Sequence, residues 1–140
     1  MARAARTERR SRVLISIRTP VAVAYCLGTL DRGVVQDLEG RVRALLFEGV
    51  RGIVCSLERV EHIHFQALEP LVDLHRLVVD AGGRFLLAGA SPYLKQILDF
   101  GGIPGRVAVA PDRLGALQEL LETLAAPAAA ATASVQQSLL

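Results

Sequence analysis

The stretch that decides the fold is Gly52-Ile53-Val54-Cys55-Ser56-Leu57, a continuous apolar run of strand length. Valine and isoleucine favour extended backbone. A run without polar alternation is typical of a strand covered on both faces, as in parallel sheets whose crossover helices pack on the two sides. The run therefore predicts a central strand of an α/β sheet.

Two strands and a helix are expected before the central strand. Residues 13–17 alternate apolar and polar side chains, Thr19-Pro20 interrupts the pattern, and residues 21–27 resume as a mostly apolar run. A helix is expected next, ending near Gly49, because apolar residues then recur at helical spacing. These are Val34, Leu38, Val42, Leu45 and Leu46.

Helices and strands are expected to alternate after the central strand. A helical stripe over residues 68–79 ends at a pair of glycines, and a strand is expected at 84–88. Ser91-Pro92 predicts the start of a third helix. A strand at 106–110 and a helical stripe over 114–124 follow. This order predicts an α/β fold with a mixed, mostly parallel sheet of four to five strands packed by about four helices.

Length and composition indicate one domain with a tail at each end. The chain has 140 residues, 51% of them hydrophobic, which suffices for one core. Residues 1–12 are Arg-rich and predict a basic flexible tail, residues 13–125 the domain, and residues 126–140 an Ala-rich flexible tail. A secretory pattern and an apolar stretch of bilayer-spanning length are both missing. We therefore expect a cytoplasmic protein without stable membrane insertion.

The residues that bind metals are few in this sequence. Cys26 and Cys55 are the only cysteines and lie in strand-like segments, so we interpret them as buried free thiols. His62, His64 and His75 leave a three-histidine metal cluster as an alternative to surface and packed histidines. The preferred interpretation is that the chain holds no metal and no cofactor.

Several segments in order resemble the landmarks of a STAS domain of the anti-sigma factor antagonist type. They are CLGTLD (26–31), GIVCSL (52–57), VEHIHFQALEPL (60–71), AGGRFLLAGASPYLKQILDFGGI (81–103) and the closing helix, together covering roughly residues 13–125. The most specific pieces are Gly28-x-Leu30-Asp31 and Ser91-Pro92-x-x-Lys95. The resemblance implies the STAS-like fold and a protein-binding module that is not an enzyme.

In that family, the loop before the second helix carries an Asp-Ser-Ser-Gly motif whose second serine is phosphorylated by a partner anti-sigma kinase. The matching positions here are His64, Phe65, Gln66 and Ala67. Gln66 has no hydroxyl group to accept a phosphoryl group. We therefore expect no phosphorylation at the family's usual position.

The resemblance also implies where a partner binds. The expected surface combines a turn at 28–31, the loop at 64–67 and the start of the second helix. The partner-binding residues are Gly28, Thr29, Asp31, His64, Phe65, Gln66, Ala67 and Glu69. Phe65 is interpreted either as an exposed anchor or as part of the core. The expected partner is an anti-sigma factor kinase, a signalling scaffold or another ATPase-fold protein.

The sequence is also compatible with other functions. An accessory subunit that stabilises the ATPase of a lipid-trafficking ABC transporter is the main alternative. The Arg-rich tail suggests nucleic-acid binding as a third hypothesis, but aromatic residues that stack on bases are scarce, so no nucleic-acid partner is expected. The sequence lacks a recognisable Ser-His-acid grouping and a Walker-type loop, so no catalytic residue is assigned. A homodimer remains open.

Overall fold

The structure is a computed structural model that describes residues 13–124. Its sheet contains β1 (Val13–Arg18), β2 (Val21–Leu30), β3 (Gly52–Ile63), β4 (Arg84–Ala88) and β5 (Ala108–Ala110), in the order β1-β2-β3-β4-β5. β1 runs antiparallel to β2, and the other neighbours are parallel. The expected α/β fold with a mixed, mostly parallel sheet is confirmed, and the predicted strand at residues 52–57 lies in its centre.

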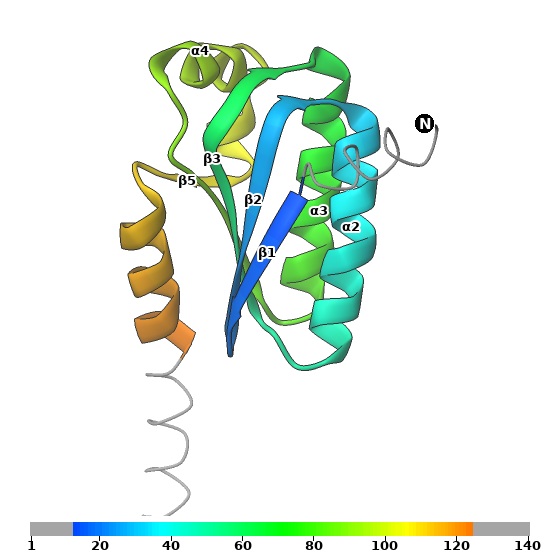
Figure 1. The fold of residues 1–140 in the computed structure, drawn as a ribbon, viewed down its shortest axis with the longest axis vertical. Coiled ribbons are helices and arrows are strands. Elements are labelled where there is room, and N and C mark those ends of the chain that lie inside the picture. The colour runs from blue at the N-terminus through cyan, green and yellow to red at the C-terminus, as the bar shows by residue number, and fades with distance from the viewer. Residues whose placement is uncertain (1–12, 125–140) are drawn as a thin grey trace, which may run out of the picture.

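Helices cover both faces of this sheet (Figure 1). α2 (Arg32–Phe47) and α3 (Leu68–Asp80) lie on one face, here called the first face, and a helix over residues 113–124 lies on the second face. α4 (Pro92–Phe100) lies at the end of the sheet, and the short helices η1 (Phe65–Ala67) and η2 (Ile103–Gly105) precede α3 and β5.

Side chains at the helix starts satisfy free backbone N–H groups. The Asp31 carboxylate accepts a hydrogen bond of 2.9 Å from the amide of Val34 at the start of α2. The Ser91 hydroxyl accepts one of 3.2 Å from the amide of Leu94, with Pro92 at the first helical position. The predicted start of the third helix at Ser91-Pro92 is confirmed, because these residues replace the bonds that a helix end lacks.

Two hydrophobic clusters fill the space between helices and sheet. The larger one lies on the first face and includes Leu38, Ile53 and Leu71. The smaller one lies on the second face, where Leu120 packs on residues of the central strands such as Val54. β3 contributes to both clusters, which explains why its first six residues are buried and, apart from Ser56, carry no polar side chain.

The turn expected at residues 28–31 is wrong. β2 continues to Leu30 and β3 continues to Ile63, with Thr29 paired to His62 and irregular register on the way. Gly28 adopts a φ of +75°, a conformation that favours glycine, next to one of these irregularities. β4 pairs with β3 only as far as Ser56, so the rest of β3 needs no apolar cover on both faces and carries charged residues.

The two cysteines lie side by side beneath α2 and α3. Cys26 on β2 and Cys55 on β3 are free and buried, and their Sγ atoms are 3.6 Å apart. The hydrogen bond between them, and then burial, raise the pKa of the Cys55 thiol well above its ordinary value. The interpretation of both as buried free thiols is confirmed.

The tails expected at residues 1–12 and 126–140 lie outside the described residues. Within residues 13–124, each helix is too short or too polar to cross a bilayer.

Candidate functional site

The expected binding residues gather at one end of the sheet, where the parallel strands β2 and β3 end. The backbone amide of His64 donates a hydrogen bond of 2.9 Å to the carbonyl of Leu30, which joins the ends of the two strands. η1 and the first turn of α3 follow directly. Loops at the carboxyl ends of strands are the usual place for binding sites in such sheets.

Phe65 is the most prominent side chain of the predicted loop. It is 77% exposed, which excludes the interpretation of Phe65 as a core residue. His64, Gln66 and Glu69 are exposed beside it, and Gly28 and Thr29 are partly exposed. An exposed aromatic ring offers a large contact area at a low cost in side-chain entropy.

Two of the expected contact residues have structural roles in the fold. Ala67 is fully buried, so its methyl group is not part of the exposed surface. Its amide donates a hydrogen bond of 2.9 Å to the carbonyl of His64, which closes the η1 turn. The carboxylate of Asp31 is held by α2 as its cap. The buried methyl group and the closed turn together hold Phe65 and Gln66 outward.

His62 joins this surface from the end of β3. Its Nδ1 lies 2.7 Å from the hydroxyl of Tyr93 on α4, and the two rings stack at 5.8 Å between centroids. The ring of His64 contacts the His62 ring edge-on at 5.4 Å. His75 lies elsewhere, against Phe85. Among the residues that the structure describes, no three side chains of the metal-binding types come together.

A salt bridge closes the other side of the surface. Arg106, which follows η2, donates to both carboxylate oxygens of Glu69 on α3, at 2.7 and 3.3 Å. This hydrogen-bonded pairing holds the pKa of Glu69 below its ordinary value. Because both side chains are exposed, the pair contributes little to the stability of the fold. Its main effect is to fix the positions of the two charged groups on the surface.

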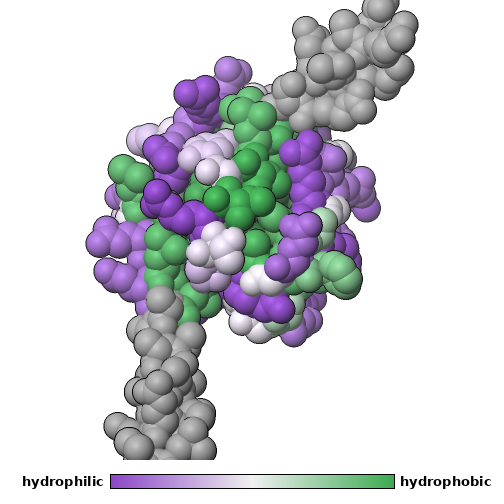
Figure 2. All heavy atoms as spheres, turned by 60° about the horizontal axis from the view of Figure 1, so that its bottom comes forward, coloured by the Kyte–Doolittle hydropathy of each residue, from purple (hydrophilic) through white to green (hydrophobic). Residues whose placement is uncertain are grey.

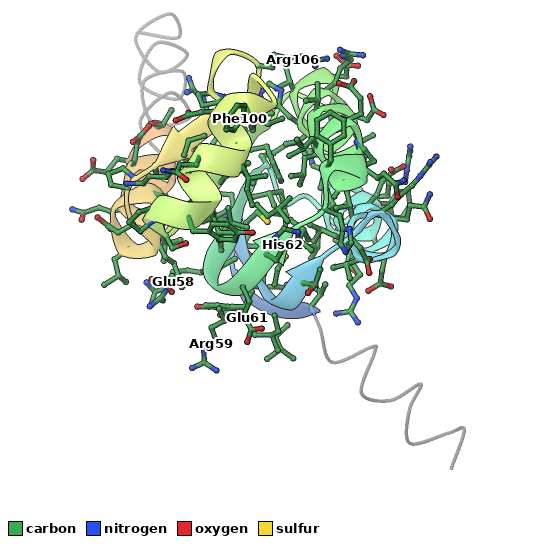
Figure 3. The ribbon with its side chains drawn as sticks, turned by 90° about the horizontal axis from the view of Figure 1, so that it is seen from above. Glu58, Arg59, Glu61, His62, Phe100 and Arg106 are labelled. Atoms are coloured by element: carbon green, nitrogen blue, oxygen red, sulfur yellow. The ribbon has the colours of Figure 1, made fainter. Side chains whose placement is uncertain are left out.

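Sequence reasoning missed two aromatic residues on α4. Phe100 is 91% exposed and Tyr93 is 51% exposed. Gly101, next to Phe100, packs closely against Leu68 at the start of α3, so Phe100 lies near the Phe65 loop. Figure 3 shows Phe100, His62 and Arg106 on the same end of the molecule. The available signal was that both aromatic residues fall outside the inward-facing stripe of α4 (Leu94, Ile97 and Leu98).

We refer to these side chains together as the carboxyl-end surface. It comprises Thr29, His62, His64, Phe65, Gln66, Glu69, Tyr93, Phe100 and Arg106. Its chemistry is aromatic and polar, with one internally paired charge couple. Such a surface is suited to binding a protein, because a few exposed rings surrounded by polar groups are typical of interfaces.

Several solved structures have the same fold. An anti-sigma factor antagonist from Mycobacterium paratuberculosis is 19% identical over 77% of this chain and 92% of its own, with a TM-score of 0.66. A variant of RsbS from Moorella thermoacetica is 22% identical over 81% of this chain and 97% of its own (TM-score 0.67). The phosphorylated form of the Bacillus cell-fate determinant SpoIIAA is 18% identical over 76% and 97% (TM-score 0.59).

At these identities the likeness shows the fold, and no curated protein sequence matches the chain. The family model of the STAS domain matches residues 12–113, which is well over half of the sequence. The segments on which the resemblance was first based fall largely within this range. The chain belongs to the STAS domain family.

Proposed function

We propose that this chain is a non-catalytic regulator of the anti-sigma factor antagonist type, which binds an anti-sigma factor kinase or a signalling scaffold through the carboxyl-end surface. Membership of the STAS family and the anti-sigma antagonists among its structural neighbours support a regulatory, protein-binding role. The observation that carries the proposal is Phe65, a large ring that is 77% exposed on the loop implied by the family resemblance.

The packing around Phe65 supports its role as an anchor. The buried neighbours Ala67 and Leu68 fix the start of α3, so the ring is presented from a rigid element. A second exposed ring, Phe100, is held near it by the contact of Gly101 with Leu68. Rigid aromatic anchors lose little entropy on binding, and such residues account for much of the affinity in protein interfaces.

In this chain, partner binding is not switched off by phosphorylation at position 66. In a phosphorylated relative the modification would add about two negative charges to the interface. The exposed carboxamide of Gln66 cannot take part in this reaction, so the bound state is controlled by the amounts of the two partners or by another site.

Partner capture with the full chain tests the binding surface. The expected partner is an anti-sigma factor kinase from the native cell, and Phe65→Ala and Phe100→Ala are each expected to weaken its binding at least about tenfold. Phe47→Ala is the matched control, because Phe47 is 94% exposed but lies at the far end of α2. Equal binding of the partner by all three variants would refute the assignment of the carboxyl-end surface as the binding surface. Recovery of a transporter ATPase instead would favour the accessory-subunit alternative.

Phosphorylation with ATP and the captured kinase tests the missing switch. The natural chain is expected to remain unmodified at residues 64–67, whereas Gln66→Ser is expected to gain phosphate there, detected by mass spectrometry. Gln96→Ser, an exposed position on α4, is the control for unspecific labelling. Phosphate on the natural loop would contradict the proposal.

A further inference from the structure

A hollow of about 300 Å³ lies on the second face of the sheet, where β1, β2 and β3 meet the start of the C-terminal helix. It is lined by Leu14, Tyr25, Leu27, Glu58, Arg59 and Arg113. This volume is at the lower end of the range for small-molecule sites. In Figure 3, Glu58 and Arg59 lie away from Phe100 and Arg106, so the hollow is separate from the carboxyl-end surface.

Arg113 is held rigidly at the wall of this hollow. Its Nε donates a hydrogen bond of 3.0 Å to Glu58, and its Nη1 donates one of 3.2 Å to the Tyr25 hydroxyl. The guanidinium carbon lies 5.4 Å from the centre of the Tyr25 ring, within the range of a cation–π contact. A guanidinium group has five N–H donors, so these two bonds leave donors of Arg113 for a ligand.

Arg59 supplies a second cation at the same hollow. It makes no hydrogen bond or ion pair with another side chain in the described part of the chain. The charges at the lining are therefore two guanidinium groups and the single carboxylate of Glu58, which already pairs with Arg113. The excess positive charge favours an anion.

The rest of the lining is apolar. Leu14 is 50% exposed although it lies in a strand, opposite Tyr25 in the β1–β2 pair, and Leu27, two residues after Tyr25 on β2, also lines the hollow. Figure 2 shows apolar side chains gathered in a band between polar ones on the face it presents, so the domain does leave apolar surface uncovered. A ligand that buries Leu14 and Leu27 would gain from removing them from water.

We propose that this hollow binds a small amphipathic carboxylate, with its head group held by Arg59 and Arg113 and its hydrocarbon part on Leu14 and Leu27. A carboxylate is planar and accepts paired hydrogen bonds from guanidinium groups, which matches the donors that remain on these arginines. The site does not depend on the proposed partner, because none of its lining residues belongs to the carboxyl-end surface.

Titration of the ¹⁵N-labelled full chain with octanoate tests the site by NMR. The chemical shifts of the backbone amides of Leu27 and Arg59 and of the Arg113 Nε are expected to change and to level off as octanoate is added. Arg59→Gln is expected to weaken octanoate about tenfold, since it removes a charge-assisted hydrogen bond. Arg84→Gln on β4, an exposed arginine outside the hollow, is the matched control and should bind like the natural chain.

A comparison of octanoate with acetate distinguishes the contribution of the ligand's hydrocarbon chain from that of its carboxylate. Leu14→Ser should weaken octanoate but leave the weaker binding of acetate unchanged, because acetate has no chain to place on Leu14. The proposal is overturned if octanoate causes no saturable shifts at the hollow, or if Arg59→Gln and Arg84→Gln have the same effect. Inorganic phosphate that binds as tightly as octanoate would overturn the assignment of an amphipathic ligand.

Discussion

Helices cover the two faces of the sheet to different extents. The more completely covered face contributes more to the stability of the fold, and the less covered face leaves side chains accessible to a ligand. On the first face, two long helices bury residues such as Leu38 and Leu71 completely. On the second face, the described helix over 113–124 buries Ala116 and Leu120, whereas Leu117 and Leu121 remain partly exposed. The first face therefore contributes most of the core, and the second face leaves room for the hollow at β1 to β3.

The difference follows from how each helix meets the sheet. α2 and α3 belong to crossover connections between parallel strands, so each of them lies along the sheet between two strands that it links. The helix over 113–124 follows the edge strand β5 and returns across the second face without a further strand in the described residues. A single helix covers only part of a five-stranded sheet.

Protection of buried cysteines gives the largest expected effect. Native Cys26 and Cys55 on the first face should react with a thiol reagent at least about a thousandfold more slowly than in urea, because exposure requires opening of the core. The raised pKa of Cys55 acts in the same direction, since the thiolate is the reactive form.

The matched probe for the second face is Ala116→Cys, at a buried position, in a chain whose two native cysteines are replaced by alanine. It should be labelled faster than the native pair, in a stopped assay read by mass spectrometry. Equal protection at the two faces would show that the second helix is as firmly packed as α2 and α3.

Two leucine substitutions compare the packing energies directly. Leu71→Ala on the first face should cost about 3–5 kcal/mol, because the side chain is fully enclosed and leaves a cavity. Leu120→Ala on the second face should cost about 2–3 kcal/mol, since its partly exposed neighbours can close over the space. Urea unfolding measures both, and a larger loss for Leu120→Ala would reverse the comparison.

Gly52, at the start of β3, packs closely against the helix over 113–124. A Cβ atom on Gly52 would lie 2.7 Å from Leu124 Cδ1 and 3.1 Å from Val21 Cγ2. Gly52→Ala should therefore destabilise the fold by about 1–2 kcal/mol. The displacement of side chains that makes room for the new methyl group should be confined to the second face. Gly40→Ala is the control, because this exposed position in α2 has open space and should gain up to about 1 kcal/mol.

The smallest expected effect concerns the Glu69–Arg106 pair, which fastens the start of α3 to the segment after η2. The pKa of Glu69 is lowered in the folded state, so its contribution to stability is complete above its ordinary value near 4.5 and is lost as the pH falls through the lowered pKa. Unfolding curves of the natural chain and Glu69→Gln should therefore converge in acid. A difference that grew at low pH would contradict this sign.

Much of the fold was predictable because its elements have strong local signals. The inward-facing stripes of α2 and α3, the cap at Ser91 and the apolar run in β3 each depend on neighbours in the sequence. The ends of β2 and β3 were not predictable in this way. Charged residues at 58, 59 and 61 look like a loop, and they form a strand only because β2 pairs alongside them.

The candidate site also has a part that was predictable from the sequence and a part that was not. The loop at residues 64–67 was predicted from its resemblance to a family motif, and its exposure at Phe65 was left open. Tyr93 and Phe100 were missed because α4 reaches the ends of β2 and β3 only in the folded chain. The hollow at Arg59 and Arg113 could not be predicted from the sequence, since these two arginines are 54 positions apart.

The sequence by itself determined the order of strands and helices, the central position of β3 and the buried state of Cys26 on β2 and Cys55 on β3. These properties follow from periodicity and from local hydrogen bonds, which act over a few residues. Only the tertiary structure decided which side chains meet, such as His62 with Tyr93 or Arg113 with Glu58. Such contacts join segments that are distant in the chain, and their geometry is set by the packing of whole elements against the sheet.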